Sequence, residues 1–234
     1  MLGTIVNAVV VLVMGTLGLI IKSRLSDKYK HAVLTAIGIS VMFVGASGAI
    51  KNMMLDNANP VLFIISLVVG VIIGTLIGID KKVQKLGNLI QRKFAKKSEN
   101  SSFTKAFTYS SVLFCAGTMS ILGSIESGTQ GVHTTLFAKA SIDGITAMIL
   151  ASTEGIGVLF SAIPILIYQG AMTLLAGEVG QYLTADMLRE IGIVGGIVIT
   201  CIGIDMIEIK KIKIANFLPA IFIPIIYYAV IGRL

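Results

Sequence analysis

The sequence predicts an all-α integral membrane protein, a polytopic bundle of about eight transmembrane helices. Of its 234 residues, 55% are hydrophobic and 13% are charged, whereas a soluble domain carries roughly 25% charged residues. The uncharged residues gather in runs close to the ~20 residues with which a helix crosses ~30 Å of hydrocarbon. A buried helix of a soluble protein would show a polar stripe at helical spacing, and these runs do not.

The runs define the spans in chain order, and the whole chain forms one membrane domain. No basic residue precedes the first run, unlike a cleaved signal peptide, so we expect it to be retained. Span three is expected to begin at Pro60, because Asn59 is a good N-cap and Pro is favoured at the first helical position. Lys139 and Asp143 interrupt span five, so seven spans are the alternative. The expected spans are 3–21, 32–50, 60–79, 104–124, 135–153, 156–177, 191–207 and 215–232.

The net charge of +7 is distributed by loop. Because cytoplasmic loops accumulate Lys and Arg, the segments 22–31, 80–105 and 207–213 are predicted to be cytoplasmic and both termini external. This pattern disfavours nucleic acid as a partner and favours anionic lipid headgroups. The basic residues of these loops are Lys22, Arg24, Lys28, Lys30, Lys81, Lys82, Lys85, Arg92, Lys93, Lys96, Lys97, Lys105, Lys210, Lys211 and Lys213.

Residues 80–97 have a different pattern from the spans. Val83, Leu86, Ile90 and Phe94 recur at helical spacing, and basic residues fill the other face. Such a segment is typical of a basic amphipathic helix lying on the cytoplasmic leaflet. A solvated charged linker is the alternative.

Weak matches at a nearly constant offset predict an inverted repeat of spans one to three (3–79) and six to eight (156–232) around central spans four and five (104–153). Transporters built from inverted repeats bind their substrates near the midplane, at broken helices. The matched positions are Gly3 and Gly157, Asn7 and Ser161, Gly38 and Gly196, and Gly45 and Gly203.

Glycines recur every four residues in span three, at Gly70, Gly74 and Gly78. This spacing gives a flat helix face that another backbone can approach closely. The partner helix could belong to the same chain or to a second copy, so a homodimer is one arrangement that the pattern allows.

The polar centre of the chain lies between residues 114 and 154. Lys139 and Asp143 are one helical turn apart and can pair on one face. Intramembrane charges usually face a partner or a water-filled cavity, so this pair is either a structural ion pair or part of a solute or ion site. Glu126 could instead lie at the external interface, and Asn7 and Ser161 could simply bond neighbouring helices. The other polar residues that could contribute to such a site are Thr118, Ser120, Ser124, Ser141, Glu126, Asn7, Ser161 and Gln169.

No motif for enzymatic chemistry is recognisable. A phosphate-binding loop, a metalloprotease helix and a defensible Ser/His/Asp set are missing from the sequence. Cys115 and Cys201 are interpreted as small packing residues. We therefore expect no enzymatic activity, no cofactor and no metal.

Several short motifs are spread over essentially the whole chain. They are Phe114-Cys-Ala-Gly117, Ile121-Leu-Gly-Ser124, Lys139-Ala-Ser-Ile-Asp143-Gly144, Ala151-Ser-Thr-Glu-Gly-Ile-Gly157, Ser161-Ala162, Tyr168-Gln-Gly170 and Lys211-Ile-Lys-Ile-Ala-Asn216-Phe-Leu-Pro219. Together they resemble the bacterial membrane family called domain of unknown function 554, the YdfK/YqgA-like proteins. The resemblance implies a bacterial inner-membrane protein and supplies no substrate. The family pattern commonly places Pro after Gly117, where this chain has Thr118, so the helix break that the pattern implies there lacks its usual residue.

The leading functional prediction is a small secondary transporter or channel for a small polar or ionic solute, with its site at spans four and five. A membrane-embedded enzyme is the first alternative, for which Lys139, Asp143, Glu126 and Cys115 offer the chemistry. A structural or regulatory membrane protein is the second, with polar residues that only join helices.

Overall fold

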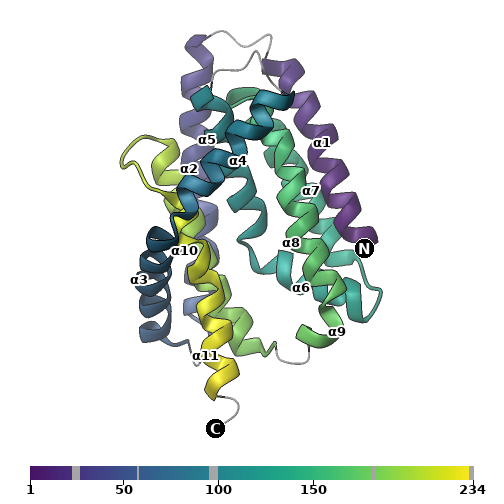
Figure 1. Ribbon diagram of the computed structural model, residues 1–234, viewed down its shortest axis with the longest axis vertical. Coiled ribbons are helices and arrows are strands. Elements are labelled where there is room, and N and C mark those ends of the chain that lie inside the picture. The colour runs from purple at the N-terminus through teal and green to yellow at the C-terminus, as the bar shows by residue number, and fades with distance from the viewer. Residues whose placement is uncertain (23–26, 57, 95–99, 181–182, 232–234) are drawn as a thin grey trace.

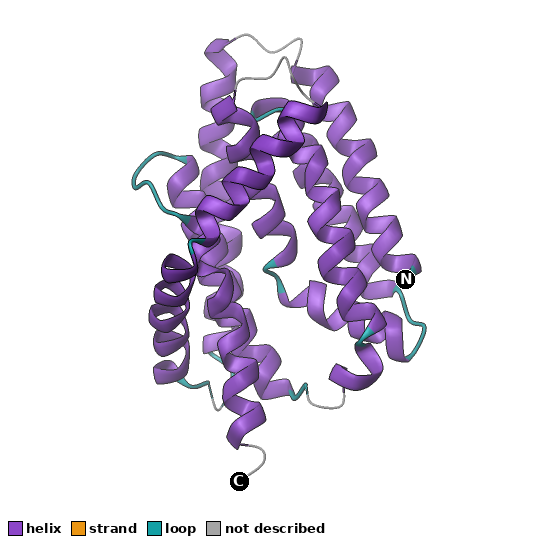
Figure 2. Cartoon of the chain, in the orientation of Figure 1, coloured by secondary structure: helices purple, strands orange, loops and turns teal. Residues whose placement is uncertain are grey.

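The computed structural model describes residues 1–234 except 23–26, 57, 95–99, 181–182 and 232–234. The described residues form helices joined by short loops, without a strand (Figures 1 and 2). The helices are α1 (Leu2–Lys22), α2 (Asp27–Met53), α3 (Pro60–Ile77), α4 (Ile79–Phe94), α5 (Asn100–Cys115), α6 (Thr118–Thr129), α7 (Thr134–Thr153), η1 (Ile156–Ser161), α8 (Ala162–Leu174), α9 (Ala176–Val179), α10 (Ala185–Met206), η3 (Ile214–Phe222) and α11 (Ile223–Ile231).

The predicted class, a polytopic helical bundle, is confirmed. Within the described chain, six helices are long and apolar enough to cross a membrane: α1, α2, α3, α7, η1 with α8, and α10. A seventh is added if α5 and α6 together count as one span. A shorter apolar segment, Ile214–Val230, lies where the eighth span is expected. The count of eight, like the repeat, remains a prediction.

The start of α3 follows the predicted capping signal. The Asn59 side chain accepts hydrogen bonds from the backbone N–H groups of Val61 and Leu62, both at 3.1 Å. Pro60 occupies the first turn, where its missing N–H costs nothing. The helix ends at Gly78, whose φ of 69° lies in the left-handed region that favours glycine.

The central span 104–124, expected as one helix, is broken. Helix α5 ends at Cys115, α6 begins at Thr118, and their axes differ by 58°. The break occurs without proline, and two of its polar groups find partners inside the protein. The Ser120 hydroxyl donates to the carbonyl of Phe114 at 2.8 Å, and the Ala116 N–H still bonds the carbonyl of Val112.

Glycines bring α2 and α10 into close antiparallel contact. A β-carbon built on Gly45 would lie 2.6 Å from the Gly196 carbonyl oxygen, and one built on Gly203 would lie 2.6 Å from the Gly38 carbonyl oxygen. Close packing of this kind replaces the hydrophobic driving force that helices lack in lipid. Helices α1 and α7 form a second extensive pair, in which Gly18 lies against the Met148 carbonyl.

The glycine face of α3 packs within the same chain. Gly70 lies against the backbone of Ala220 and Gly74 against that of Asn216, both in η3. Gly78, grouped with them by its spacing, caps the helix, and a β-carbon added there would contact nothing within 4 Å. Of the two partners that the spacing allowed, the glycine face of α3 thus contacts a helix of its own chain.

The amphipathic helix α4 lies diagonally across the bundle (Figure 1). Part of the apolar face that was assigned to lipid instead packs on α5, because Val83 and Ile90 contact the buried cluster of Phe103 and Phe107. Leu86 remains exposed. The predicted residues 95–97 of this helix lie outside the described residues.

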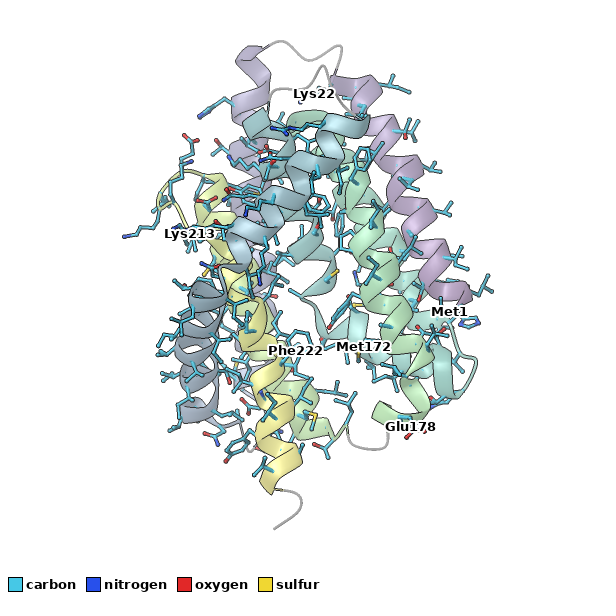
Figure 3. All side chains as sticks on the ribbon, in the orientation of Figure 1. Met1, Lys22, Met172, Glu178, Lys213 and Phe222 are labelled. Carbon is cyan, nitrogen blue, oxygen red and sulfur yellow. The ribbon has the colours of Figure 1, made fainter. Side chains whose placement is uncertain are left out.

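Two residues of the described basic segments, Lys22 and Lys213, lie in the same half of the molecule. In Figure 3, Lys22 and Lys213 lie in the upper half of the view, and Glu178 lies near the lower end. The start of α1 and the end of α11 point away from the end that holds Lys22 (Figure 1). In space, too, the labelled basic residues lie toward one end of the bundle and the acidic Glu178 toward the other.

Substituting Gly45 by alanine should destabilise the α2–α10 contact. The added methyl group would overlap backbone atoms, and overpacking typically costs about 1–3 kcal/mol. A β-carbon added to Gly48, on the same helix, would have nothing within 4 Å, so Gly48→Ala is the matched control. Thermal unfolding of the detergent-purified protein should show a lower Tm for Gly45→Ala only; equal Tm values for the two variants would contradict this packing.

Candidate functional site

A buried ion pair on α7 forms the centre of the candidate site. Lys139 and Asp143 pair through Nζ and Oδ2, one helical turn apart. Their exposed fractions are 5% and 6%. Because an isolated charge in hydrocarbon is costly, each of these two groups needs a partner inside the protein, and each supplies one for the other.

Two amides from other helices extend this pair. Asn7 of α1 donates from Nδ2 to Asp143 Oδ2 at 3.0 Å and to Gln169 Oε1 of α8 at 3.3 Å. Both amide side chains are fully buried. The network therefore ties α1, α7 and α8 together around one carboxylate, and we refer to these four residues as the polar cluster.

Small residues on α1 and α7 bring Asn7 to Asp143. Val10 and Met14 of α1 fill the space that a side chain at Gly144 would occupy. On α1 itself, Gly3 lies against Leu136 and Gly18 against the α7 backbone. The approach of α1 therefore follows from missing β-carbons on both sides of the contact.

A cavity of about 610 Å³ lies on the other side of the ion pair, between α2, α7, α10 and the α5–α6 break. Its volume is within the range of small-molecule sites. Lys139 and Asp143 line it, and side chains such as Val41, Phe114 and Ile199 make its walls mostly apolar.

The break in the central span faces this cavity. Gly117 and Thr118 line it, and Gly117 is the N-cap of α6 without a side chain that caps the helix. The first N–H groups of a helix carry a partial positive charge and favour negative groups. The positive end of α6 and the Lys139 ammonium therefore act on the same cavity.

The predicted serine and threonine residues of the site do not all lie beside the ion pair. Ser141 is exposed and bonds the Phe137 carbonyl, so it points away from the polar cluster. Ser161 is buried and donates to the Val158 carbonyl, and Ser120 supports the break. Ser124 is buried, and its hydroxyl has no partner among the described residues. Thr118 is thus the predicted hydroxyl residue that lines the cavity with the ion pair.

Sequence reasoning missed Thr146 and Ser40 as cavity-lining residues. Thr146 lies three residues after Asp143, on the same helix face, and this spacing was an available signal. Ser40 lies on α2, far away in sequence, and only the packing of α2 against α10 brings it here. Both hydroxyls donate to a carbonyl of their own helix, at 2.8 and 2.9 Å.

Of the four residues named for enzyme-like chemistry, Lys139 and Asp143 are paired, whereas Cys115 and Glu126 do not line the cavity with them. Cys115 lines a different cavity of about 260 Å³ together with Tyr168. Glu126 accepts a hydrogen bond from Thr135 at 2.6 Å, near the start of α7. Among the described residues, no group of three or more His, Cys, Asp or Glu side chains is placed to hold a metal ion.

These features define a multi-pass helical membrane protein with a polar cluster inside the bundle. The chain belongs to the family described as "Protein of unknown function (DUF554)", which it matches over residues 2–229, as the sequence motifs predicted. It is 35% identical to the "Uncharacterized membrane protein YdfK" of Bacillus subtilis (strain 168), over 94% of this chain and 92% of the relative. It is 30% identical to the "Uncharacterized protein YqgA" of Escherichia coli (strain K12), over 93% and 92%. No solved structure matches the chain.

Removing one partner of the ion pair should destabilise the fold strongly. In Lys139→Met, the Asp143 carboxylate is left buried with only Asn7 as a partner, and such losses cost about 3–5 kcal/mol. Replacing both residues, as Lys139→Met with Asp143→Leu, should recover much of the loss because no charge remains buried. Thermal unfolding of the three proteins checks this, and a double variant less stable than Lys139→Met would contradict it.

Proposed function

We propose that this protein moves a small polar or ionic solute across the bacterial inner membrane, with its binding site in the cavity beside Lys139 and Asp143. The observation that carries the proposal is the position of this buried pair, which lines a cavity of about 610 Å³ at a broken span. Irregular backbone at membrane depth is tolerated where it is buried in protein or lines a cavity. Substrate sites at discontinuous helices are common among secondary transporters.

The packing of the bundle supports movement around this cavity. Helices α2 and α10 form one tightly packed pair and α1 and α7 another, whereas α2 and α7 touch only sparingly. The cavity lies where these two pairs meet. Two stiff units with a sparse contact can rock against each other, as alternating access requires.

The proposed inverted repeat fits the glycine contacts between α2 and α10. If Gly38 corresponds to Gly196 and Gly45 to Gly203, a two-fold rotation carries the contact of Gly38 with Gly203 onto that of Gly196 with Gly45. Both contacts are close. The proposed movement takes place within one chain, because the glycine face of α3 is occupied by η3 of that chain.

A purely structural role is the second candidate, and the polar cluster itself favours it. Asn7, Gln169 and the ion pair hold three helices together by hydrogen bonds. Such bonds stabilise membrane helices without any solute. The two candidates differ in what they require of the charges: a scaffold tolerates a well-packed apolar replacement, and a transport site does not.

Flux measurements separate the two candidates. Purified protein in proteoliposomes would be tested for uptake of a panel of amino acids, organic anions and organic cations. We expect that Asp143→Asn abolishes the flux of the transported solute, because this carboxylate lines the site. The double variant Lys139→Met with Asp143→Leu should be folded and inactive.

Ser141→Ala is the matched control on the same helix, because Ser141 is exposed. It should keep the wild-type flux. A double variant that is stable and fully active would contradict the transport site at this pair.

The proposed orientation places the basic loops in the cytoplasm, next to anionic lipid headgroups. In a Cys115→Ala and Cys201→Ala background, single cysteines at Lys82 and Asp56 would be treated with an impermeant maleimide in spheroplasts. Asp56→Cys should react from outside, and Lys82→Cys should react only after permeabilisation. The reverse labelling would overturn the orientation.

A further inference from the structure

The cavity beside the polar cluster carries balanced charge. Among the described residues that line it, Lys139 and Asp143 are the charged ones, one of each sign. A solute with a net charge would add an uncompensated charge to this mostly apolar space, and taking a charge out of water without a partner is unfavourable. A solute that is neutral overall avoids that cost.

Only one of the two carboxylate oxygens of Asp143 accepts hydrogen bonds from the described residues. Lys139 and Asn7 both bond Oδ2. The other oxygen, Oδ1, has no hydrogen-bond partner among the described residues, and it is not among their fully enclosed unpaired atoms. Oδ1 is therefore an accessible acceptor on a residue that lines the cavity.

Lys139 has donor capacity beyond its bond to Asp143. An ammonium carries three N–H donors, and the carboxylate takes one of them. Gly117 and Thr118, at the start of α6, also line the cavity, and no side chain caps this helix. An incoming carboxylate would thus meet the Lys139 ammonium and the positive end of a helix.

From these observations we propose that the site takes a zwitterion of the α-amino-acid class with an apolar side chain. Its ammonium would bond Asp143 Oδ1, and its carboxylate would bond Lys139 and the start of α6. The opposite charges of the protein are adjacent, as they are in an α-amino acid. This inference rests on the proposed function, because it names the substrate class of the same site.

The ion pair does not have to open to take such a ligand. The ammonium of the zwitterion bonds Asp143 Oδ1, and its carboxylate bonds the N–H donors of Lys139 that Asp143 leaves free, so no charge is left unpaired. Asn7 continues to hold Asp143 Oδ2. A quaternary ammonium fits less well, because it has no N–H to donate and Phe114 is the single aromatic residue among the described lining residues.

Calorimetric titration of the purified protein in nanodiscs tests the proposal. The probes are alanine, valine, leucine and phenylalanine, with leucinamide and 4-methylpentanoate as leucine analogues that lack one charge each. We expect binding of at least one amino acid, and binding of leucine about tenfold or more tighter than of either analogue, because each analogue loses a charged hydrogen bond. Failure of all four amino acids to bind, or an analogue that binds as tightly as leucine, would overturn the proposal.

Variants localise the binding. Asp143→Asn and Lys139→Met should each abolish it. Lys211→Met is the control, because it breaks the exposed Glu208–Lys211 pair outside the cavity, and it should bind as wild type does. Binding that persists in Asp143→Asn would overturn the proposed site. If a single variant fails to fold, the analogue comparison on the wild type still decides.

The outcomes also separate this inference from the transport proposal. Amino-acid binding without flux in proteoliposomes would refute transport and leave the ligand class standing. Flux of some other solute that Asp143→Asn abolishes, without amino-acid binding, would support transport and refute the ligand class.

Discussion

The structure depends on one constraint: a polar group within the hydrocarbon must find its partner inside the protein. Regular helices satisfy it for most of the backbone. At the α5–α6 break it is met by Ser120, whose hydroxyl bonds the Phe114 carbonyl, and by the Ala116 N–H, which keeps its helical bond. The Ala116 carbonyl lies against Gly195 of α10, so this part of the break is buried in protein.

Much of the fold follows from local sequence. Uncharged runs give most of the spans, and Asn59 with Pro60 marks the start of α3 because capping uses groups within one turn. The break at Gly117 was harder to predict, since Thr118 is compatible with a continuous helix. It depends on Ser120 and on α10, which no local pattern reveals. The packing of Val83 and Ile90 on α5 was missed for the same reason.

In the candidate site, too, residues close in sequence could be predicted to meet, whereas those on other helices could not. Lys139 and Asp143 could be predicted as a pair because residues one turn apart share a helix face. That Asn7 and Gln169 complete the cluster could not be, because it requires α1 and α8 to meet α7 at one level. Their amides could be nominated only as polar residues inside apolar runs. Ser141 failed as a site residue because its place on α7 is exposed, which the helical spacing from Asp143 already indicated.

The glycine contacts pack pairs of helices tightly, whereas the ion pair lies beside a cavity. Glycines allow α2 to approach α10 and α1 to approach α7 so closely that the packing permits little adjustment. Lys139 and Asp143 lie on α7 of one pair and line a cavity that α2 and α10 of the other pair also line. Fully closed packing would have favoured apolar residues at Lys139 and Asp143, since replacing a buried pair by apolar side chains is often neutral or stabilising. A charged pair kept beside a cavity, with one carboxylate oxygen accessible, is the arrangement that the proposed ligand site requires.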